Sequence, residues 1–274
     1  ITGGTGTDSD GKPYTGDTVS LSGTAVANFD DKDVADATTV SFSGLSLSGA
    51  EAGNYSLTTH ADSSHSITPK ALTISGLSSA NKVYDATVNA ALSGSASLQT
   101  SIAGGTGTDS DGKPYTGDTV SLSGTAVANF DDKDVADATT VSFSGLSLSG
   151  AEAGNYSLTT HADSSHSITP KALTISGLSS ADKVYDATVS AALSGSASLQ
   201  TSITGGTGTD SDGKPYTGDT VSLSGTAVAN FDDKDVADAT TVSFSGLSLS
   251  GTEAGNYSLT THADASHSIT SKAL

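Results

Sequence analysis

The residues with the clearest metal-binding chemistry lie in an acidic loop that occurs three times. In its second occurrence, residues 108–118, Asp109, Asp111 and Asp118 supply carboxylates and Gly112 permits a tight turn. Hard oxygen ligands of this kind are what Ca²⁺ takes, so the loop is a candidate calcium site. The corresponding carboxylates in the other two occurrences are Asp8, Asp10 and Asp17, and Asp210, Asp212 and Asp219.

A simpler interpretation of this loop needs no metal. The Asp-x-Asp-Gly fragment matches only part of a calcium loop, because the later ligands and a bidentate Glu at the right offset are missing. The Gly112-Lys113-Pro114 sequence is typical of a solvated hairpin turn. On this interpretation, we expect calcium to raise the melting temperature no more than sodium does at equal ionic strength.

A second acidic cluster offers the same two interpretations. Asp131, Asp132, Asp134 and Asp137 lie around Lys133. A structural turn is the simpler interpretation, and a metal site is the alternative. The sequence alone does not show whether the fold brings the two clusters together.

Nothing in the sequence predicts catalysis. Cys is absent, which excludes a thiol nucleophile, and no Ser–His–Asp set can be singled out among so many Ser and Thr residues. We therefore expect no enzyme activity and no cofactor apart from the candidate calcium. A Lys–Asn isopeptide crosslink would need Lys82 or Lys171 with Asn155. A turn hydrogen bond is the simpler role for Asn155.

The composition excludes further classes of protein. The chain has 274 residues, with 11 Lys and Arg against 30 Asp and Glu, for a net charge of −19. Such a chain repels phosphate backbones, so we expect no nucleic-acid partner. No run approaches the roughly 20 apolar residues of a membrane helix, so we expect no membrane insertion.

Internal repetition decides the architecture. The sequence GGTGTDSDGKPYTGDTV begins at positions 3, 104 and 205, a period of 101 residues. This period is too long for common solenoid repeats of about 20–50 residues and fits one folded domain per repeat. A proline in SITPKALTI suits a joint between strands. Cutting there gives a partial unit at 1–70 that lacks its first strands, complete units at 71–171 and 172–272, and the start of another at 273–274. We expect both ends to belong to a longer array.

The local pattern within each unit is that of strands and turns. Apolar residues alternate with Ser and Thr, as in Val141-Ser142-Phe143-Ser144, which is typical of half-buried strands. The alternation changes phase at Gly76 and Gly145, which predicts bulges or bends there. We predict an all-β fold of tandem immunoglobulin-like β-sandwich domains. The alternatives are β-grasp-like, mostly-β units or a continuous β-solenoid.

Three motifs occur in the same order in these units. They are KVYDATVNAALSG (82–94), FDDKDVADATTVSFSGLSLSGAEAGNYSLT (130–159) and SITPKALTISGL (167–178). They resemble the YDG and MBG repeats of large bacterial surface adhesins, including filamentous-haemagglutinin-like and biofilm-matrix adhesins. Two departures stand out: Ala86 and Ala187 replace the usual glycine after Tyr-Asp, and residues 101–118 form a longer loop. The resemblance implies a secreted, cell-surface or extracellular-matrix protein in which these domains form a stalk.

Two functions follow as expectations. The first is a structural repeat region, an extended stalk or fibre in cell adhesion or biofilm, whose partners are neighbouring repeats and other copies in a fibre. The second is an array that binds a surface glycan or protein multivalently, with Tyr115 as the candidate aromatic contact. The partial unit at 1–70 should expose a sheet edge. Either preceding chain or another molecule would supply the strands that it lacks.

Overall fold

The computed structural model describes the whole chain except residues 8, 59–60, 63–64, 160–161, 164–165, 261–262 and 265–266. The described residues form strands, turns and three short 3-10 turns, with no α-helix among them. The prediction of an all-β fold is therefore confirmed, and the several small sheets are consistent with sandwich repeats. No helix in the described part of the chain is long and apolar enough to cross a membrane.

The strands recur with the sequence period. Up to the first Pro-containing segment, the elements are β1 (Ser20–Phe29), β2 (Val40–Ser48), η1 (Ala52–Asn54) and β3 (Ala61–Asp62). Then come β4 (Lys70–Ser78), β5 (Lys82–Val83), β6 (Ser93–Leu98), β7 (Ser121–Phe130), β8 (Val141–Ser149), η2 (Ala153–Asn155), β9 (Tyr156–Thr159), β10 (Ala162–Asp163) and β11 (Ile168–Thr169). The last set is β12 (Lys171–Ser179), β13 (Lys183–Val184), β14 (Ser194–Leu199), β15 (Ser222–Phe231), β16 (Val242–Ser250), η3 (Ala254–Asn256), β17 (Tyr257–Thr260), β18 (Ala263–Asp264) and β19 (Ile269–Thr270).

Spatial contacts divide the chain into two compact units. Unit 1 comprises Ile1–Ile74, Ser97–Ser123 and Ser147–Thr159. Unit 2 comprises Ser75–Ala96, Gly124–Leu146 and Thr160–Leu274. Each unit therefore contains residues from more than one sequence repeat. Residues 101 positions apart in the sequence are called equivalent. The repeat boundaries at 71–171 and 172–272 remain a prediction.

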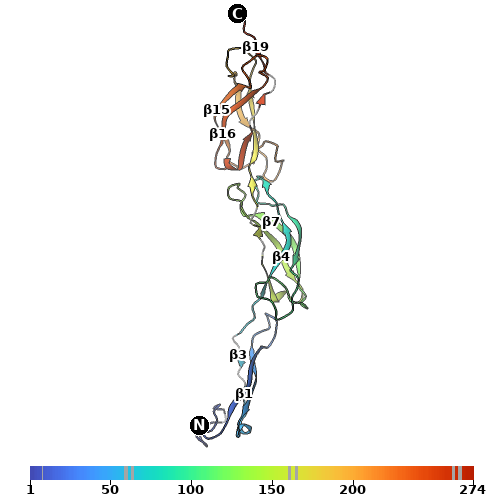
Figure 1. Cartoon of the computed structure of the whole chain (residues 1–274), viewed down its shortest axis with the longest axis vertical. Helices are drawn as coiled ribbons and strands as arrows, with labels where there is room; N and C mark the ends of the chain where they lie inside the picture. The colour runs from blue at the N-terminus through green and yellow to red at the C-terminus, as the bar shows by residue number, and fades with distance from the viewer. Residues whose placement is uncertain are drawn as a thin grey trace. The chain divides into compact units, whose positions relative to one another are not determined.

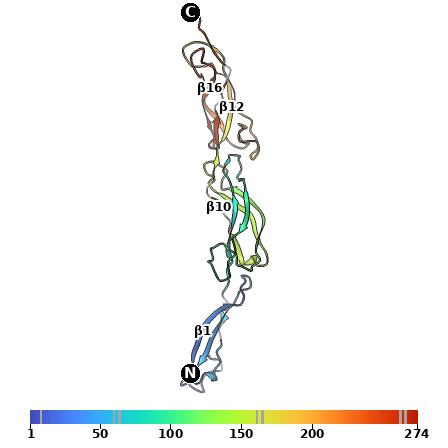
Figure 2. The same cartoon turned by 45° about the vertical axis from the view of Figure 1, so that its right-hand side comes forward.

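Antiparallel hairpins carry most of the sheet structure. β15 pairs with β16 (Figure 1), and the short β18 extends that sheet. β1 pairs with β2 in the same register, visible near the N-terminus in both views (Figures 1 and 2). Ser222 and Ser250 hydroxyls lie 3.0–3.1 Å apart across their strands, as do the equivalent pairs. Such cross-strand Ser pairs stabilise a sheet face that is exposed to water.

Parallel pairs close each repeat. β12 pairs in parallel with β17 and antiparallel with β14, and it lies in the C-terminal part of the chain in Figure 2. β4 pairs with β9 in the same way, and β5 with β11 and β13 with β19 are parallel pairs. Strands near the start of a repeat are thus bonded to strands near its end. Strands β5 and β13 begin the KVYDATV segments, residues 82–88 and 183–189. These segments therefore take part in the parallel pairing between the start and the end of a repeat.

The predicted bulges are confirmed at glycines. The β12–β14 register shifts between Ser176 and Leu178, around Gly177, which is equivalent to Gly76. The β15–β16 register shifts where Gly246, equivalent to Gly145, faces two residues of β15. Gly246 has φ +79° and a Cβ there would lie 2.3 Å from the carbonyl oxygen of Thr226. Only glycine fits this crossing of backbones.

Candidate functional site

A buried lysine ties the acidic loop to the strand beside it. Lys171, the first residue of β12, is fully buried, and its Nζ lies 3.0 Å from Oδ1 of Asp212. The same Nζ donates a hydrogen bond of 3.1 Å to the hydroxyl of Tyr216 and lies 4.2 Å from the centre of its ring. A buried ammonium is costly without such partners. The pair therefore fixes the loop to the sheet.

The carboxylate of Asp212 also closes the turn of the loop. It accepts hydrogen bonds from the backbone N–H groups of Thr209, at 3.0 Å, and Lys214, at 2.8 Å. Burial acts to raise the pKa of Asp212, but the hydrogen bonds from Lys214 and Lys171 outweigh it, and the pKa is lowered. The carboxylate thus stays ionised while it holds the turn.

Unit 1 contains the equivalent arrangement. Asp111 lies 2.9 Å from Nζ of Lys70 and accepts hydrogen bonds from the backbone of Thr108 and Lys113. The Lys113 N–H, followed by Lys70, lowers the pKa of Asp111 to about 2. The Lys70 ammonium also lies 4.2 Å from the ring centre of Tyr115.

The three predicted calcium ligands of a loop have different surroundings. Asp212 pairs with Lys171, Asp219 accepts hydrogen bonds from tyrosine hydroxyls, and Asp210 is exposed. In the second loop, Asp111 pairs with Lys70, Asp118 accepts a hydrogen bond from the Tyr156 hydroxyl, and Asp109 is exposed. In the first loop, Asp10 accepts a hydrogen bond from the backbone within its turn, and Asp17 accepts one from the Tyr55 hydroxyl. Asp8 lies outside the described residues. Calcium binding by this loop remains a prediction.

The second acidic cluster is brought together in its third occurrence. Within the described part of the chain, Asp233, Asp235 and Asp238 place carboxylate oxygens within 4.8 Å of one another. They are equivalent to Asp132, Asp134 and Asp137 of the predicted cluster. Asp235 also lies 2.7 Å from Nζ of Lys234, and Asp233 accepts a hydrogen bond from the backbone of Asp235. These contacts are those of a structural turn.

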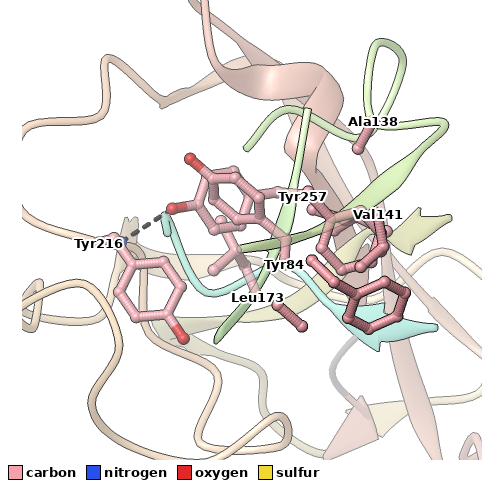
Figure 3. Close-up of a cluster of buried hydrophobic side chains, with 10 residues drawn as sticks. Tyr84, Ala138, Val141, Leu173, Tyr216 and Tyr257 are labelled. Atoms are coloured by element: carbon pink, nitrogen blue, oxygen red, sulfur yellow. Dashed lines mark hydrogen bonds between the residues drawn. The ribbon is translucent and has the colours of Figure 1, made fainter. Parts of the chain in front are cut away.

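The main functional candidate is a cluster that we call the tyrosine joint, made of Tyr84, Tyr216, Tyr257 and Asp219 in unit 2 (Figure 3). Tyr84 is fully buried, and its ring meets those of Tyr216 and Tyr257 edge-on, with centroids 5.8 and 5.3 Å apart. Edge-to-face packing of this kind stabilises beyond area burial alone. The joint connects the KVYDATV segment of one sequence repeat with the loop and strand of the next.

A single carboxylate satisfies the buried hydroxyls of the joint. Asp219 accepts hydrogen bonds from Tyr84, at 2.9 Å, and Tyr257, at 2.5 Å. The Tyr257 hydroxyl in turn accepts one from the backbone N–H of Tyr216, at 2.9 Å, the dashed line in Figure 3. Burial, followed by the bond to Asp219, raises the pKa of Tyr84 and of Tyr257. Both phenols therefore stay protonated and act as donors.

Backbone and amide contacts complete the joint. The N–H of Gly206 donates to the carbonyl of Asp85 at 2.7 Å. Asn256 accepts from the backbone of Val135 and donates to Asp134, each at 2.8 Å. The contacts again join residues of one repeat with residues of the next. This provides a specific, hydrogen-bonded connection in addition to the covalent link.

The KVYDATV segment is held in shape by its own lysine. Nζ of Lys82 lies 2.6 Å from Asp85 and 2.6 Å from the carbonyl of Thr87. In residues 183–189 the equivalent distances from Lys183 are 2.8 and 2.7 Å. The segment thus has one conformation whether its tyrosine is fully buried, as Tyr84 is, or partly exposed, as Tyr185 is.

The side chains considered for an isopeptide crosslink have other partners. Asn155 donates to Asp33 and accepts from the backbone N–H of Val34. In unit 2, Asn256 makes the equivalent bonds to Asp134 and Val135. Lys82 and Lys171 pair with aspartates. Burial acts to lower the pKa of Lys171, but the hydrogen bonds to Tyr216 and Asp212 outweigh it, and the pKa is raised. Lys171 therefore stays a charged ammonium, which is not a nucleophile. The side chain of Asn155 therefore makes long-range hydrogen bonds rather than the turn hydrogen bond predicted for it.

The role of the tyrosines at the repeat boundary does not follow from the sequence pattern. That pattern predicts Tyr84, Tyr115 and Tyr156 as core residues and Asp219 as a candidate calcium ligand. A signal was present: Tyr84, Tyr216 and Tyr257 recur at the period of 101 residues in a chain with only 5% aromatic residues. Aromatic residues that are scarce and strictly placed mark packing sites. Which of them meet across a repeat boundary depends on the parallel pairings, which the local pattern does not predict.

A tandem array of all-β repeats linked by such joints defines a class of modular repeat protein. The family model of the YDG domain matches the chain three times in succession, over residues 2–63, 68–164 and 169–265. The chain belongs to the YDG domain family, as its motifs indicated. Neither the curated proteins nor the solved structures compared with it contain a match.

Proposed function

We propose that this chain is a structural repeat region of a bacterial surface or extracellular-matrix adhesin, forming an extended stalk or fibre in cell adhesion or biofilm. The observation that carries the proposal is the tyrosine joint. Every residue of the joint belongs to the repeated sequence, so an array of any length can form the same connection at each step. A stalk needs such repeated, directional connections between its domains.

The chemistry of the chain supports this role. The fully buried Lys171 bonds to Asp212 and Tyr216. The fully buried Tyr84 bonds to Asp219, which is partly buried and belongs to the next repeat. The net charge of −19 favours solubility and repulsion between neighbouring arrays. The resemblance of the motifs to those of bacterial surface adhesins supports a secreted or cell-surface location, with neighbouring repeats as the main partners.

The candidate contact of the alternative function, a glycan- or protein-binding array, is Tyr115, which is partly buried in unit 1. Tyr216, equivalent to Tyr115, is 3% exposed and lies over Lys171. A glycan-binding platform requires an exposed ring face. The buried tyrosine serves the joint instead.

A replacement experiment distinguishes the two functions. In the producing bacterium, the array is exchanged for an unrelated β-sandwich array of equal length, and surface attachment is measured beside a strain in which the array is deleted. A structural stalk predicts loss on deletion and restoration by the unrelated spacer. Loss that the spacer does not restore would contradict the proposal and favour a binding array.

A further inference from the structure

We propose that β12 is the centre of a mechanical clamp, a set of contacts that stops the strand from being pulled lengthwise out of its sheet. The clamp consists of β12, β17 and the acidic loop of residues 209–219, all of which lie in unit 2. Resistance to pulling is a function in addition to spacing. The inference rests on the strand pairing and does not depend on the proposed stalk function.

The direction of the two strands determines how a pulling force acts on them. β12 and β17 are parallel, with residues 171–174 opposite residues 257–260. The preceding chain enters β12 at its N-terminal end, and the following chain leaves β17 at its C-terminal end. Pulling on these two ends therefore slides the strands past each other along their axes. The evenly spaced hydrogen bonds of a parallel pair are then loaded together rather than one after another.

The acidic loop holds the same stretch of β12 from a second side. The backbone N–H of Thr174 donates to the carbonyl of Gly213 at 3.1 Å. Leu173, which is fully buried, is paired both with Leu259 of β17 and with Gly213 of the loop. A Cβ on Gly213 would lie 2.2 Å from Oγ1 of Thr174, so the loop and the strand are in close contact. The start of β12 is therefore bonded to two partners at once.

Lys171 fastens the end of β12 at which the load enters. Its fully buried ammonium lies 3.0 Å from Oδ1 of Asp212 and donates to the Tyr216 hydroxyl at 3.1 Å. Both partners belong to the acidic loop, so the first residue of the strand is tied to the loop by its side chain. A buried ion pair is screened by water and salt much less than an exposed one, so it resists separation more strongly.

Unit 1 contains the same three parts. β4 and β9 are parallel, with residues 70–73 opposite residues 156–159. The N–H of Thr73 donates to the carbonyl of Gly112 at 3.1 Å, and Nζ of Lys70 lies 2.9 Å from Asp111. The strand pair, the loop contact and the lysine thus recur together with the sequence period, as expected of a device that every repeat uses.

Resistance to pulling is a kinetic property of the few residues that must separate first. Forced unfolding is governed by the rate of unfolding and not by the equilibrium free energy. β12 and β17 enclose the chain from β13 to β16, so this part of the sheet bears no load while the clamp holds. Substitutions in the clamp should therefore change the unfolding force, and substitutions in the enclosed hairpin should not.

The experiment is single-molecule force spectroscopy on the full chain. The chain has no cysteine, so handles attach only where cysteines are introduced. Pro170→Cys with Thr260→Cys pulls the N-terminal end of β12 against the C-terminal end of β17, which loads the clamp in shear. Pro170→Cys with Gly255→Cys pulls both strands from their N-terminal ends and opens the same pairing bond by bond. All three positions are exposed, and each pair encloses about 300 Å of extended chain.

The unfolding force in the shear geometry should be at least about twofold that in the second geometry, because several hydrogen bonds break together. Lys171→Met keeps the length of the side chain and removes its charge, so it should lower the force in shear. The control is Gly246→Ala in the β15–β16 hairpin, outside the clamp. It should lower the midpoint of urea unfolding and leave the force in shear unchanged.

Equal forces in the two geometries would overturn the proposal. A force in shear that Lys171→Met leaves unchanged, or that Gly246→Ala lowers as much as Lys171→Met does, would also overturn it. The comparison of geometries leaves Lys171 in place, so it decides the question even if Lys171→Met does not fold. The force is measured on the isolated chain, so these outcomes are independent of the attachment assay that tests the stalk function.

Discussion

At the scale of single residues, the KVYDATV segment places an alanine in a left-handed conformation. Ala86 has φ +61° and Ala187 has φ +67°, and they are the non-glycine residues with positive φ in the described chain. An L-residue with a Cβ is strained there by about 1–2 kcal/mol. This left-handed conformation explains why the repeats that the chain resembles usually have glycine at this position.

Ala187→Gly should therefore stabilise the protein. Relief of the strain exceeds the entropic cost of glycine of about 0.5–1 kcal/mol, so a net gain of about 0.5–1 kcal/mol is expected. Ala187 is exposed, so little packing is lost. The measurement is the midpoint of urea unfolding. Ala192→Gly, at an exposed alanine outside the left-handed region, is the control and should destabilise.

A second prediction at this scale concerns acid stability. The backbone N–H groups of Thr241 and Thr240, with the Thr240 hydroxyl, lower the pKa of Asp232 from 3.8 to about 2. A carboxyl group whose pKa is depressed on folding stabilises above its unfolded pKa, and this contribution is lost as the pH falls through the folded pKa. The melting temperature should thus fall between about pH 4 and pH 2.

Asp232→Asn should flatten that part of the profile, because the amide does not titrate. Asp210→Asn, at an exposed side chain of the acidic loop, is the control. Melting curves followed by circular dichroism across this pH range make the comparison. A slope that is unchanged by Asp232→Asn would contradict the assignment.

At the scale of elements, the glycine bulges set the bend of each hairpin. Gly246→Ala combines a positive φ with a Cβ 2.3 Å from a carbonyl oxygen, so we expect a loss of about 2 kcal/mol or more. Gly255→Ala, where a Cβ meets nothing within 4 Å, should have little effect. Unfolding midpoints of the two variants test this. Equal midpoints would show that the bulge tolerates a side chain.

The sequence predicted the strands and bulges but not how the strands pair. Alternation at Val141 and Phe143 and the phase changes at Gly76 and Gly145 are local signals, and they are sufficient for strands and bends. The pairing of β12 with β17 joins residues more than 80 positions apart, and no local pattern encodes it. The tyrosine joint depends on that pairing, which is why Asp219 was assigned to a metal rather than to two phenols.

At the scale of the whole molecule, the sequence is built of repeats, and the tyrosine joint connects one repeat to the next. Family membership establishes the repeats. The joint supplies the physical reason that they act together: a fully buried Tyr84 bonded to the loop and strand of the next repeat. The proposed stalk function follows from this one contact.

The central claim is that the KVYDATV tyrosine stabilises the next repeat, and the chain contains its own control. Tyr84 and Tyr185 lie in identical heptapeptides, but Tyr84 is fully buried in the joint and Tyr185 is only partly buried. The measurement is urea unfolding of the full chain with Tyr84→Ala or Tyr185→Ala. We expect Tyr84→Ala to cost about 3–5 kcal/mol, as for other buried aromatic residues, and Tyr185→Ala to cost markedly less. Equal losses for the two substitutions would contradict the account.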